Sequence, residues 1–289
     1  MAENYETLLV TKADGITTIA FNRPEKRNAM SPQLHREMFQ LLTDLRYDKE
    51  TRAVIITGTG DNFCAGQDLK QYGLEMESQS PRVRDEVREM VRRWRNELLR
   101  TMPQPVIARI TGWCLGGALT VVAGCDIAIA ADDAQFGLPE VNFGHFPAGE
   151  TTYVMTEHLK PKHGLYYALT GKMMNAKEAE RLGLISKVVA RADLDTEVME
   201  TAKCLAEKSP IGLKAVKEAW YYSSYSAPSV AYEISNLISE RAIREHGGRP
   251  GLEQFVQKKL RPVSGVMNLG KQPFKPFKLF NRFAPFKTF

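Results

Sequence analysis

The first part of the chain changes from a strand pattern to a helix pattern. Apolar and polar side chains alternate over residues 6–22 around Gly15, which predicts a β-hairpin. From Leu34 to Leu45 the apolar side chains instead recur at helical spacing. Ser31 suits the N-cap of this helix and Pro32 its first position, so we expect the helix to begin there.

Short apolar runs alternate with helical segments between residues 50 and 130. The runs at 53–56 and 106–110 predict buried strands, and a helix is expected to open near Pro81. That helix carries apolar side chains on one face and a dense mixture of Arg and Glu on the other, which we interpret as a solvated surface. Strands and helices in alternation predict a parallel sheet joined by right-handed crossovers.

The pattern beyond about residue 195 is almost purely helical. One helix is expected to begin at Ser209-Pro210, and another to cover residues 232–243 and to end at Gly247-Gly248. Toward the C-terminus, phenylalanine recurs at every third position from Phe274 to Phe289, with Lys and Arg between. This period predicts an extended arm with one aromatic edge. We expect the arm to pack on its own or a neighbouring subunit; a membrane surface or an acidic partner is the alternative.

Two glycine segments each follow an apolar run, where a strand should turn into a loop or helix. Residues 64–68 read Cys-Ala-Gly-Gln-Asp, and residues 112–118 read Gly-Trp-Cys-Leu-Gly-Gly-Ala. Backbone N–H groups in such segments can point at a ligand. Two of them converging on one carbonyl oxygen would form an oxyanion hole, and Glu140 would supply a proton-transfer group beside it. The pattern therefore predicts acyl chemistry through an enolate.

Composition narrows the class of protein. At 289 residues and 43% apolar content, one large domain with an appendage is expected. The absence of a long apolar run and of a charged-then-apolar leader predicts a cytoplasmic protein without a membrane span. Four cysteines without CxxC spacing and five histidines without HxxxH spacing favour reduced core thiols and no metal site. The net charge of +5 fits a small molecule with several phosphates, and because Lys and Arg are spread along the chain we expect no nucleic-acid partner.

Four motifs, in order, resemble the crotonase (enoyl-CoA hydratase/isomerase) superfamily. They are residues 22–32, residues 65–70, Gly116-Gly117 and residues 255–258, and the resemblance covers residues 6 to about 262. It implies an α/β fold, a crotonase-like spiral of ββα units with a C-terminal helical region. The implied division is a core that binds the CoA ester and holds the oxyanion hole, a helical trimerisation region, and a Phe/Lys-rich arm, covering residues 1–195, 196–262 and 263–289.

The resemblance also assigns roles to residues. The N–H groups of Gln67 and Gly117 would donate to the oxyanion, and Glu140 would be the acid/base. Seven residues would contact the CoA moiety: Lys26, Arg27, Ala29, Ala65, Lys70, Phe255 and Lys258. No cofactor beyond the CoA of the substrate is expected, and the family's usual assembly implies a homo-trimer or a hexamer.

Within the superfamily, three segments resemble the hydroxycinnamoyl-CoA (feruloyl-CoA) hydratase-lyases: residues 70–72, 112–114 and 165–172. Hydratases of aliphatic enoyl-CoA generally carry a second glutamate where this chain has Thr120, whereas the hydratase-lyases carry Ser or Thr. Glu140 would then be the main acid/base. The implied reaction hydrates an aromatic enoyl-CoA and cleaves the β-hydroxy intermediate to an aromatic aldehyde and acetyl-CoA.

Residues expected at the acyl group are Tyr72, Gly116, Thr120, His145, Glu150 and Tyr232. The subgroup's Tyr-x-Tyr pair, which binds the substrate's phenol, reads Tyr232-Glu233-Ile234 here. The phenol would be held by Tyr72 alone, by Tyr232, or by one of the tyrosines at 221, 222 and 225; alternatively, the acyl group is not a 4-hydroxycinnamoyl group. His145 and Glu150 are polar where relatives are mostly Pro, Gly or apolar, which makes each a second acid/base or part of a capped loop.

Two other functions compete with the hydratase-lyase interpretation. One is a plain enoyl-CoA hydratase, dehydratase or double-bond isomerase that uses Glu140. The other, from a different class, is a non-catalytic crotonase-like binding protein that uses its basic surface or its arm. The intact Glu140 and both glycine segments favour an enzyme.

Overall fold

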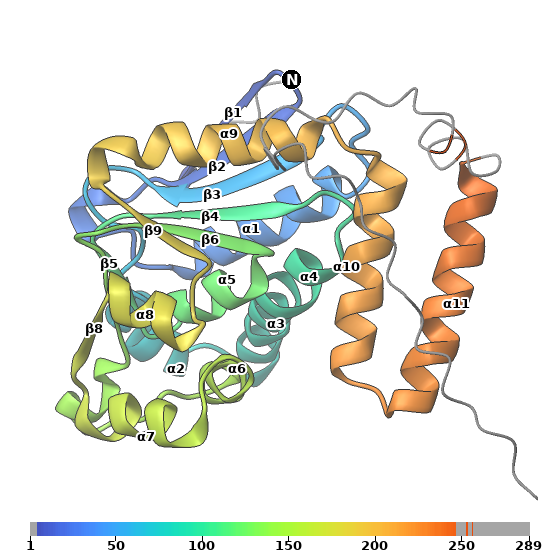
Figure 1. Ribbon diagram of the computed structural model, residues 1–289. Helices are drawn as coiled ribbons and strands as arrows, with labels where there is room; N and C mark the ends of the chain where they lie inside the picture. The colour runs from blue at the N-terminus through green and yellow to red at the C-terminus, as the bar shows by residue number, and fades with distance from the viewer. Residues whose placement is uncertain (1–4, 247–252, 254–255, 257–289) are drawn as a thin grey trace, which may run out of the picture. The chain divides into compact units, whose positions relative to one another are not determined.

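The computed structural model describes residues 5–246, 253 and 256, shown in Figure 1. Residues up to His246 form one compact unit, and residues 247–289 are grouped in a second. The predictions for Phe255, Lys258, Gly247-Gly248 and the arm at 263–289 lie outside the described residues. No helix in the described part of the chain is long and apolar enough to cross a membrane.

A six-stranded sheet forms the centre of the first unit (Figure 1). Its strands, in spatial order, are β1 (Leu8–Ala13), β2 (Ile16–Phe21), β3 (Ala53–Gly58), β4 (Val106–Ile110), β6 (Ile127–Ala131) and β9 (Lys187–Val189). The first pair is antiparallel and all others are parallel, which confirms both the hairpin and the parallel sheet. Asp14 and Gly15 at the hairpin turn have φ of 52° and 75°. Positive φ at both central residues is what a two-residue type I′ turn requires.

Both faces of this sheet are covered, because parallel strands need apolar packing on each side. Helix α9 (Leu194–Ala206) packs on one face, where Ile55, Ile107 and Val198 belong to one buried cluster. The other face packs in a larger cluster with α1 (Pro32–Leu45) and α5 (Ala118–Gly124). Ser31 caps α1 as predicted, since its Oγ accepts from Leu34 N at 3.2 Å.

A second, three-stranded sheet carries the segments around Glu140. Its order is β5 (Trp113–Leu115), β7 (Gln135–Gly137) and β8 (Met173–Asn175). The short 3₁₀ helix η4 (Pro139–Phe143) begins after β7 and holds Glu140 in its first turn. Helices α6 (Glu150–His158), α7 (Pro161–Thr170) and α8 (Ala176–Leu182) follow along the chain.

The helix predicted to open near Pro81 is confirmed as α3 (Pro81–Arg92), capped by Ser80. It continues as a π-helical turn, η3 (Arg93–Leu98), and ends with α4 (Leu99–Thr101). The interpretation of its charged face as solvated is wrong at Arg95, which is only 5% exposed. Arg95 lies four residues after buried Val91 and three before buried Leu98, so helical geometry brings it to their face.

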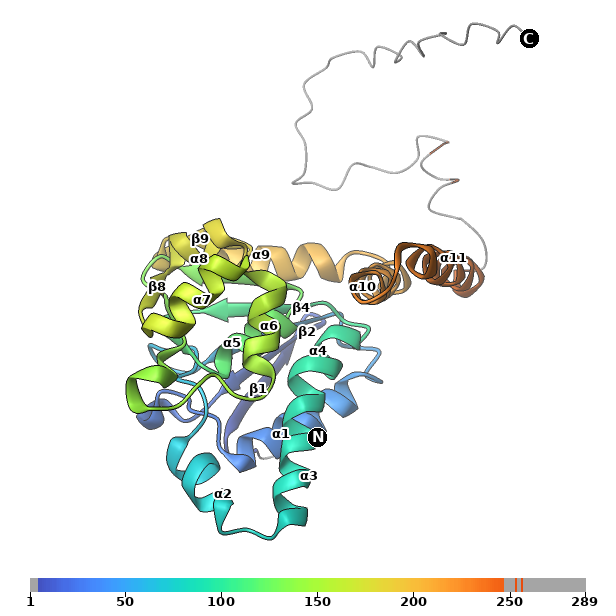
Figure 2. The same cartoon turned by 90° about the horizontal axis from the view of Figure 1, so that it is seen from below.

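The C-terminal part of the unit is helical, as predicted. Helix α10 (Pro210–Ser224) begins at the predicted residue, capped by Ser209, and lies beside α11 (Pro228–Glu245), as Figure 2 shows. α11 begins four residues before the predicted start, with Pro228 in its first turn. Large apolar side chains remain exposed on this pair, among them Trp220 at 78% and Leu237 at 64%.

Candidate active site

The structure brings the two glycine segments side by side. Backbone hydrogen bonds join Cys64 N to Trp113 O at 2.9 Å and Leu115 N to Cys64 O at 3.0 Å. On its other side the first segment pairs with Met30, whose N–H donates to Gly66 O at 2.8 Å. The segment at 64–68 therefore lies between the loop that precedes α1 and the segment that precedes α5.

Close approach of two backbone segments at Gly66 requires glycine. Gly66 has φ of +97°, and a methyl group added there would lie 2.8 Å from Leu115 O and 3.8 Å from Gly117 N. Among the described residues, no acceptor pairs with the N–H of Gln67 or the N–H of Gly117. Two neighbouring N–H donors are thus left for a ligand oxygen, which is the arrangement an oxyanion hole needs.

Glu140 lies against the second glycine segment. A methyl group added at Gly116, whose φ is +51°, would lie 2.6 Å from Glu140 Oε1. The other oxygen, Oε2, is buried and has no hydrogen-bond partner within residues 5–246. Burial raises the pKa of the Glu140 carboxyl, while its own backbone N–H and nearby His145 oppose the shift. A carboxyl with a raised pKa beside two unpaired N–H groups suits proton transfer next to an enolate.

A buried chain of hydrogen bonds fixes the side chain of Gln67. Trp94 Nε1 donates to His35 Nδ1 at 3.1 Å, and His35 Nε2 lies 2.8 Å from Gln67 Oε1. Indole nitrogen is only a donor, so His35 Nδ1 accepts and His35 Nε2–H donates to Gln67. Burial, with Arg95 nearby, lowers the pKa of His35 to about 3, which keeps the ring neutral at pH 7. His35 and Trp94 are both 0% exposed.

The anchored Gln67 side chain also packs against the second donor. Its Cγ would lie 3.5 Å from a methyl group added at Gly117. The same position faces Arg95, whose Nη1 donates to Gly117 O at 3.2 Å. His35, Trp94 and Arg95 therefore support both oxyanion segments, and sequence reasoning assigned none of them a role. The sequence signal that could have indicated that these three residues are buried is their helical spacing from apolar residues.

The residues expected at the acyl group are partly brought together. Tyr72 is half-buried, with its ring centroid 5.3 Å from that of His35. Thr120 is 1% exposed, and its hydroxyl pairs with Thr151 Oγ1 at 3.3 Å. His145 is exposed in the loop after η4, with its N–H bonded to Glu140 O at 3.0 Å. Tyr232 is 66% exposed on α11, and its role stays a prediction.

Glu150, the remaining acyl-site residue, begins α6 and is largely buried. Its Oε2 lies 3.6 Å from Arg95 Nη2. Burial raises the pKa of the Glu150 carboxyl, and Arg95 opposes the shift most strongly. The alternative phenol partner Tyr225 is already engaged, since its hydroxyl bonds both Arg100 and Glu157.

Of the residues expected to contact CoA, the described ones lie in or near the first glycine segment and the loop that it contacts. Ala65 N donates to Arg27 O at 2.9 Å, which joins this segment to the loop that holds Lys26 and Ala29. The Arg27 guanidinium lies 4.4 Å from the centre of the Trp113 ring. Lys26, Arg27 and Lys70 are exposed, so their charges are available to phosphates.

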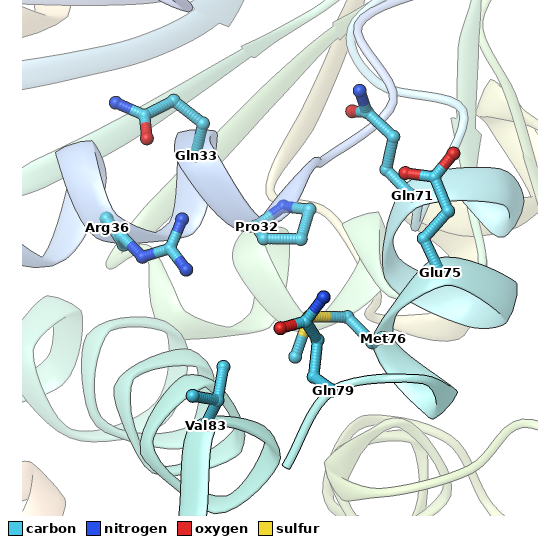
Figure 3. Close-up of a pocket in the computed structure, with 8 residues that line it drawn as sticks. All are labelled: Pro32, Gln33, Arg36, Gln71, Glu75, Met76, Gln79 and Val83. Carbon is cyan, nitrogen blue, oxygen red and sulfur yellow. The ribbon is translucent and has the colours of Figure 1, made fainter.

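A separate pocket of about 320 Å³ lies between α1 and the segment from η2 (Leu69–Leu74) through α2 (Glu75–Glu77) to α3 (Figure 3). Its lining residues are Pro32, Gln33, Arg36, Gln71, Glu75, Met76, Gln79 and Val83. Gln67, Gly117 and Glu140 do not line it, so it is distinct from the candidate site. Among the described residues, no group of three or more His, Cys, Asp or Glu side chains is arranged to hold a metal ion.

The fold agrees with that of known proteins. A sequence model of the enoyl-CoA hydratase/isomerase family matches residues 11–263, and the chain belongs to this crotonase family of enzymes. The enoyl-CoA hydratase of Mycobacterium smegmatis has a similar structure, with a TM-score of 0.81 at 26% identity over 89% of this chain and 98% of that one. The predicted family and the predicted crotonase-like fold are both confirmed.

Two relatives indicate where in the family the chain lies. The hydroxycinnamoyl-CoA hydratase-lyase of Pseudomonas fluorescens is 36% identical over 258 residues, which cover 88% of this chain and 94% of the relative. A probable enoyl-CoA hydratase of Mycobacterium bovis is 31% identical over 255 residues, covering 88% and 96%. The family binds CoA thioesters and is typically oligomeric.

Replacement of His35 tests the support of the oxyanion segments. His35→Leu should lower kcat about tenfold, a barrier increase of ~1.4 kcal/mol, because Gln67 loses its anchor. His35→Gln, which can still donate and accept, should recover most of this loss. Met38→Ala, a buried change on the same helix, should reduce stability but leave kcat intact. Steady-state kinetics and thermal melts of the three variants check this, and equal kcat in all of them would contradict the proposed support.

Proposed function

We propose that the protein hydrates an aromatic enoyl-CoA of the hydroxycinnamoyl type and cleaves the resulting β-hydroxy thioester to an aromatic aldehyde and acetyl-CoA. The observation that carries this proposal is the position of the Glu140 carboxyl against Gly116, next to the unpaired N–H groups of Gln67 and Gly117. The 36% identity to a hydroxycinnamoyl-CoA hydratase-lyase supports the choice of acyl group.

In the first step, the thioester oxygen accepts from the Gln67 and Gly117 N–H groups. The Glu140 carboxylate takes a proton from water, whose oxygen bonds to the β-carbon while the thioester becomes an enolate. The protonated Glu140 then gives its proton to the α-carbon, which leaves a β-hydroxy thioester. Removing one oxyanion donor typically costs ~2.7–4 kcal/mol of transition-state stabilisation.

In the second step, the same carboxylate removes the proton of the β-hydroxyl. The bond between the α- and β-carbons breaks, its electron pair passes to the thioester, and an aldehyde leaves. The acetyl-CoA enolate remains in the same oxyanion hole until Glu140 returns the proton to its α-carbon. The thioester is the electron sink in both steps, so the reaction needs no cofactor beyond CoA.

A plain enoyl-CoA hydratase is the second candidate function. Relatives at 31% identity are described as probable enoyl-CoA hydratases, and Glu150 supplies a second buried carboxylate near the oxyanion segments. In that case the reaction would stop at the β-hydroxy thioester. The two functions share Glu140 and differ in their products.

We further propose that the chain acts as a homo-trimer or a hexamer. Helices α10 and α11 carry four large side chains that are 64–78% exposed: Val216, Trp220, Tyr232 and Leu237. This is a large apolar surface to leave in contact with water. Packing on a second subunit would cover them, and closed symmetry is the usual outcome for a homo-oligomer. Tyr232 would then lie near a neighbouring subunit, where the hydroxycinnamoyl subgroup holds the substrate's phenol.

Replacement of Glu140 tests the acid/base assignment. Glu140→Gln should fold normally and lower kcat by about 100-fold or more, the range typical of general acid–base catalysis. Glu37→Gln is a matched control, because this glutamate is 8% exposed and, among the described residues, hydrogen-bonds to Glu6, Thr7 and Gln33. The control should affect stability rather than kcat. Retention of more than about a tenth of wild-type kcat in Glu140→Gln, a change below ~1.4 kcal/mol, would remove Glu140 as the main base.

The acidic limb of the pH profile gives a second test. Because burial raises the pKa of Glu140, the midpoint of this limb in kcat/KM should lie above the ordinary glutamate value of about 4.3. Activity is present above the midpoint and is lost as pH falls through it, since a protonated carboxyl cannot accept a proton. His145→Ala should move the midpoint upward, because His145 favours the charged form. A midpoint at or below the ordinary value would exclude a buried Glu140 as the titrating base.

Binding of CoA thioesters should raise the melting temperature, and added salt should reduce the shift. Lys26→Gln combined with Lys258→Gln should weaken the stabilisation, because both positive charges are expected to meet phosphates. Lys177→Gln removes an exposed positive charge outside the expected CoA set and is the control. Differential scanning fluorimetry with several CoA esters measures the effect, and no shift at saturating ester would overturn the CoA assignment.

A further inference from the structure

The structure contains a buried ion pair beside the oxyanion segments that the proposed reaction does not use. Arg95 and Glu150 reach this position from η3 and from the first turn of α6. Their side chains are 6% and 15% exposed. Arg95 faces Gly117, whereas Glu140 faces Gly116, so the pair and Glu140 approach the glycine segment at adjacent residues.

The pair is incompletely satisfied by protein groups. Arg95 Nη2 and Glu150 Oε2 are 3.6 Å apart, which is an ion pair but too long for a hydrogen bond. Arg95 Nη1 donates to Gly117 O at 3.2 Å. Arg95 Nε and both carboxylate oxygens of Glu150 are buried without a hydrogen-bond partner in the described part of the chain. Buried polar groups in native proteins are normally paired, so this combination points to a ligand.

Tyr72 adds a third polar group to the same neighbourhood. The charges of Arg95 and Glu150 both act on its pKa in addition to burial, which raises the pKa of Tyr72. Thr120 and Thr151 pair with each other, and Thr151 directly follows Glu150 in α6. Thr120 is therefore already satisfied, and the unpaired hydrogen-bonding capacity is that of Arg95 and Glu150.

The unpaired atoms define the chemistry of the group they would accept. Arg95 Nε–H requires an acceptor, and the Glu150 oxygens require a donor. A carboxylate would be repelled by Glu150, an ammonium by Arg95, and an apolar group would leave both unpaired. A hydroxyl donates and accepts with one oxygen and satisfies both partners.

We propose that Arg95 and Glu150 form a subsite for a hydroxyl group carried by the acyl chain of the CoA ester. This inference rests on the proposed function, which it deepens by assigning recognition of the acyl group to a pair within one subunit. The subsite gives the hydroxyl a partner that does not depend on the tyrosine replaced by Ile234. The hydroxyl is either on the aromatic ring or on the β-carbon.

Two pairs of CoA esters test the subsite by calorimetric binding to the full-length protein. The ring arm compares 3-(4-hydroxyphenyl)propanoyl-CoA with 3-phenylpropanoyl-CoA, which lack the conjugated double bond. The β-carbon arm compares 3-hydroxybutanoyl-CoA with butanoyl-CoA in the Glu140→Gln background, so that no ester is consumed. In one arm the hydroxylated ester should bind at least tenfold more tightly.

The double variant Arg95→Met with Glu150→Leu should reduce that preference to within twofold, even if both esters bind less tightly because Arg95 no longer bonds Gly117 O. Removing both charges together leaves neither one unpaired, which favours folding. Glu150→Leu alone, which keeps the Arg95 bond to Gly117 O, should also reduce the preference and separates this loss from any change in the oxyanion segments. The matched control is Arg100→Met with Glu157→Leu, a second ion pair, between α4 and α6.

The outcomes distinguish failure of the subsite from failure of the proposed function. Loss of the preference in the Arg95 and Glu150 variants but not in the control supports the subsite. Equal binding of both esters in both arms when Arg95 and Glu150 are intact, or equal loss in the control, overturns the subsite and leaves the proposed function standing. Absence of binding of any CoA ester to the wild type instead overturns the proposed function.

Discussion

The candidate site depends on the close approach of the Gly66 backbone to Leu115 O, two residues before Gly117. The segment at 64–68 hydrogen-bonds on one side to Met30 and on the other to the segment around Leu115, so its position is determined from both directions. A side chain at Gly66 would meet Leu115 O at 2.8 Å. The proposed oxyanion hole, in which the Gln67 and Gly117 N–H groups would meet one oxygen, depends on this approach.

Around this contact, the fold supplies support that is mostly buried and polar. The Trp94–His35–Gln67 chain fixes one donor segment, and Arg95 bonds the carbonyl of the other. Buried polar groups of this kind add little net stability, but a satisfied network has one preferred arrangement. The sheet and its covering helices therefore serve as a rigid base, and the network holds the donors in register with Glu140.

Much of the fold could be predicted from the sequence because its signals are local. Gly15, between two segments of alternating polarity, predicted the hairpin. Ser31 and Ser209 each directly precede a proline at which a helix begins. Both glycine segments were identified from their position after apolar runs, and Glu140 from its position downstream of the second segment. The second, three-stranded sheet has strands of three residues, too short for a periodic pattern to indicate.

The support of the site could not be predicted, because it is built from contacts between distant residues. His35 and Trp94 are 59 residues apart in the sequence. In the sequence, Arg95 cannot be distinguished from the other charged residues of its Arg/Glu-rich helix, whereas in the structure it is buried against Gly117. Glu150 presented two alternatives in the sequence, a second acid/base or a capped loop. Its ion pair with Arg95 explains its burial, and only a three-dimensional arrangement could reveal that partner.

We propose that one oxyanion site with Glu140 carries both hydration and carbon–carbon cleavage. The most direct measurement is product analysis after incubation of the wild-type protein with 4-hydroxycinnamoyl-CoA. The account predicts 4-hydroxybenzaldehyde and acetyl-CoA in equal amounts, without accumulation of the β-hydroxy thioester. Accumulation of the β-hydroxy thioester without aldehyde would show a hydratase that does not cleave, and would contradict the claim.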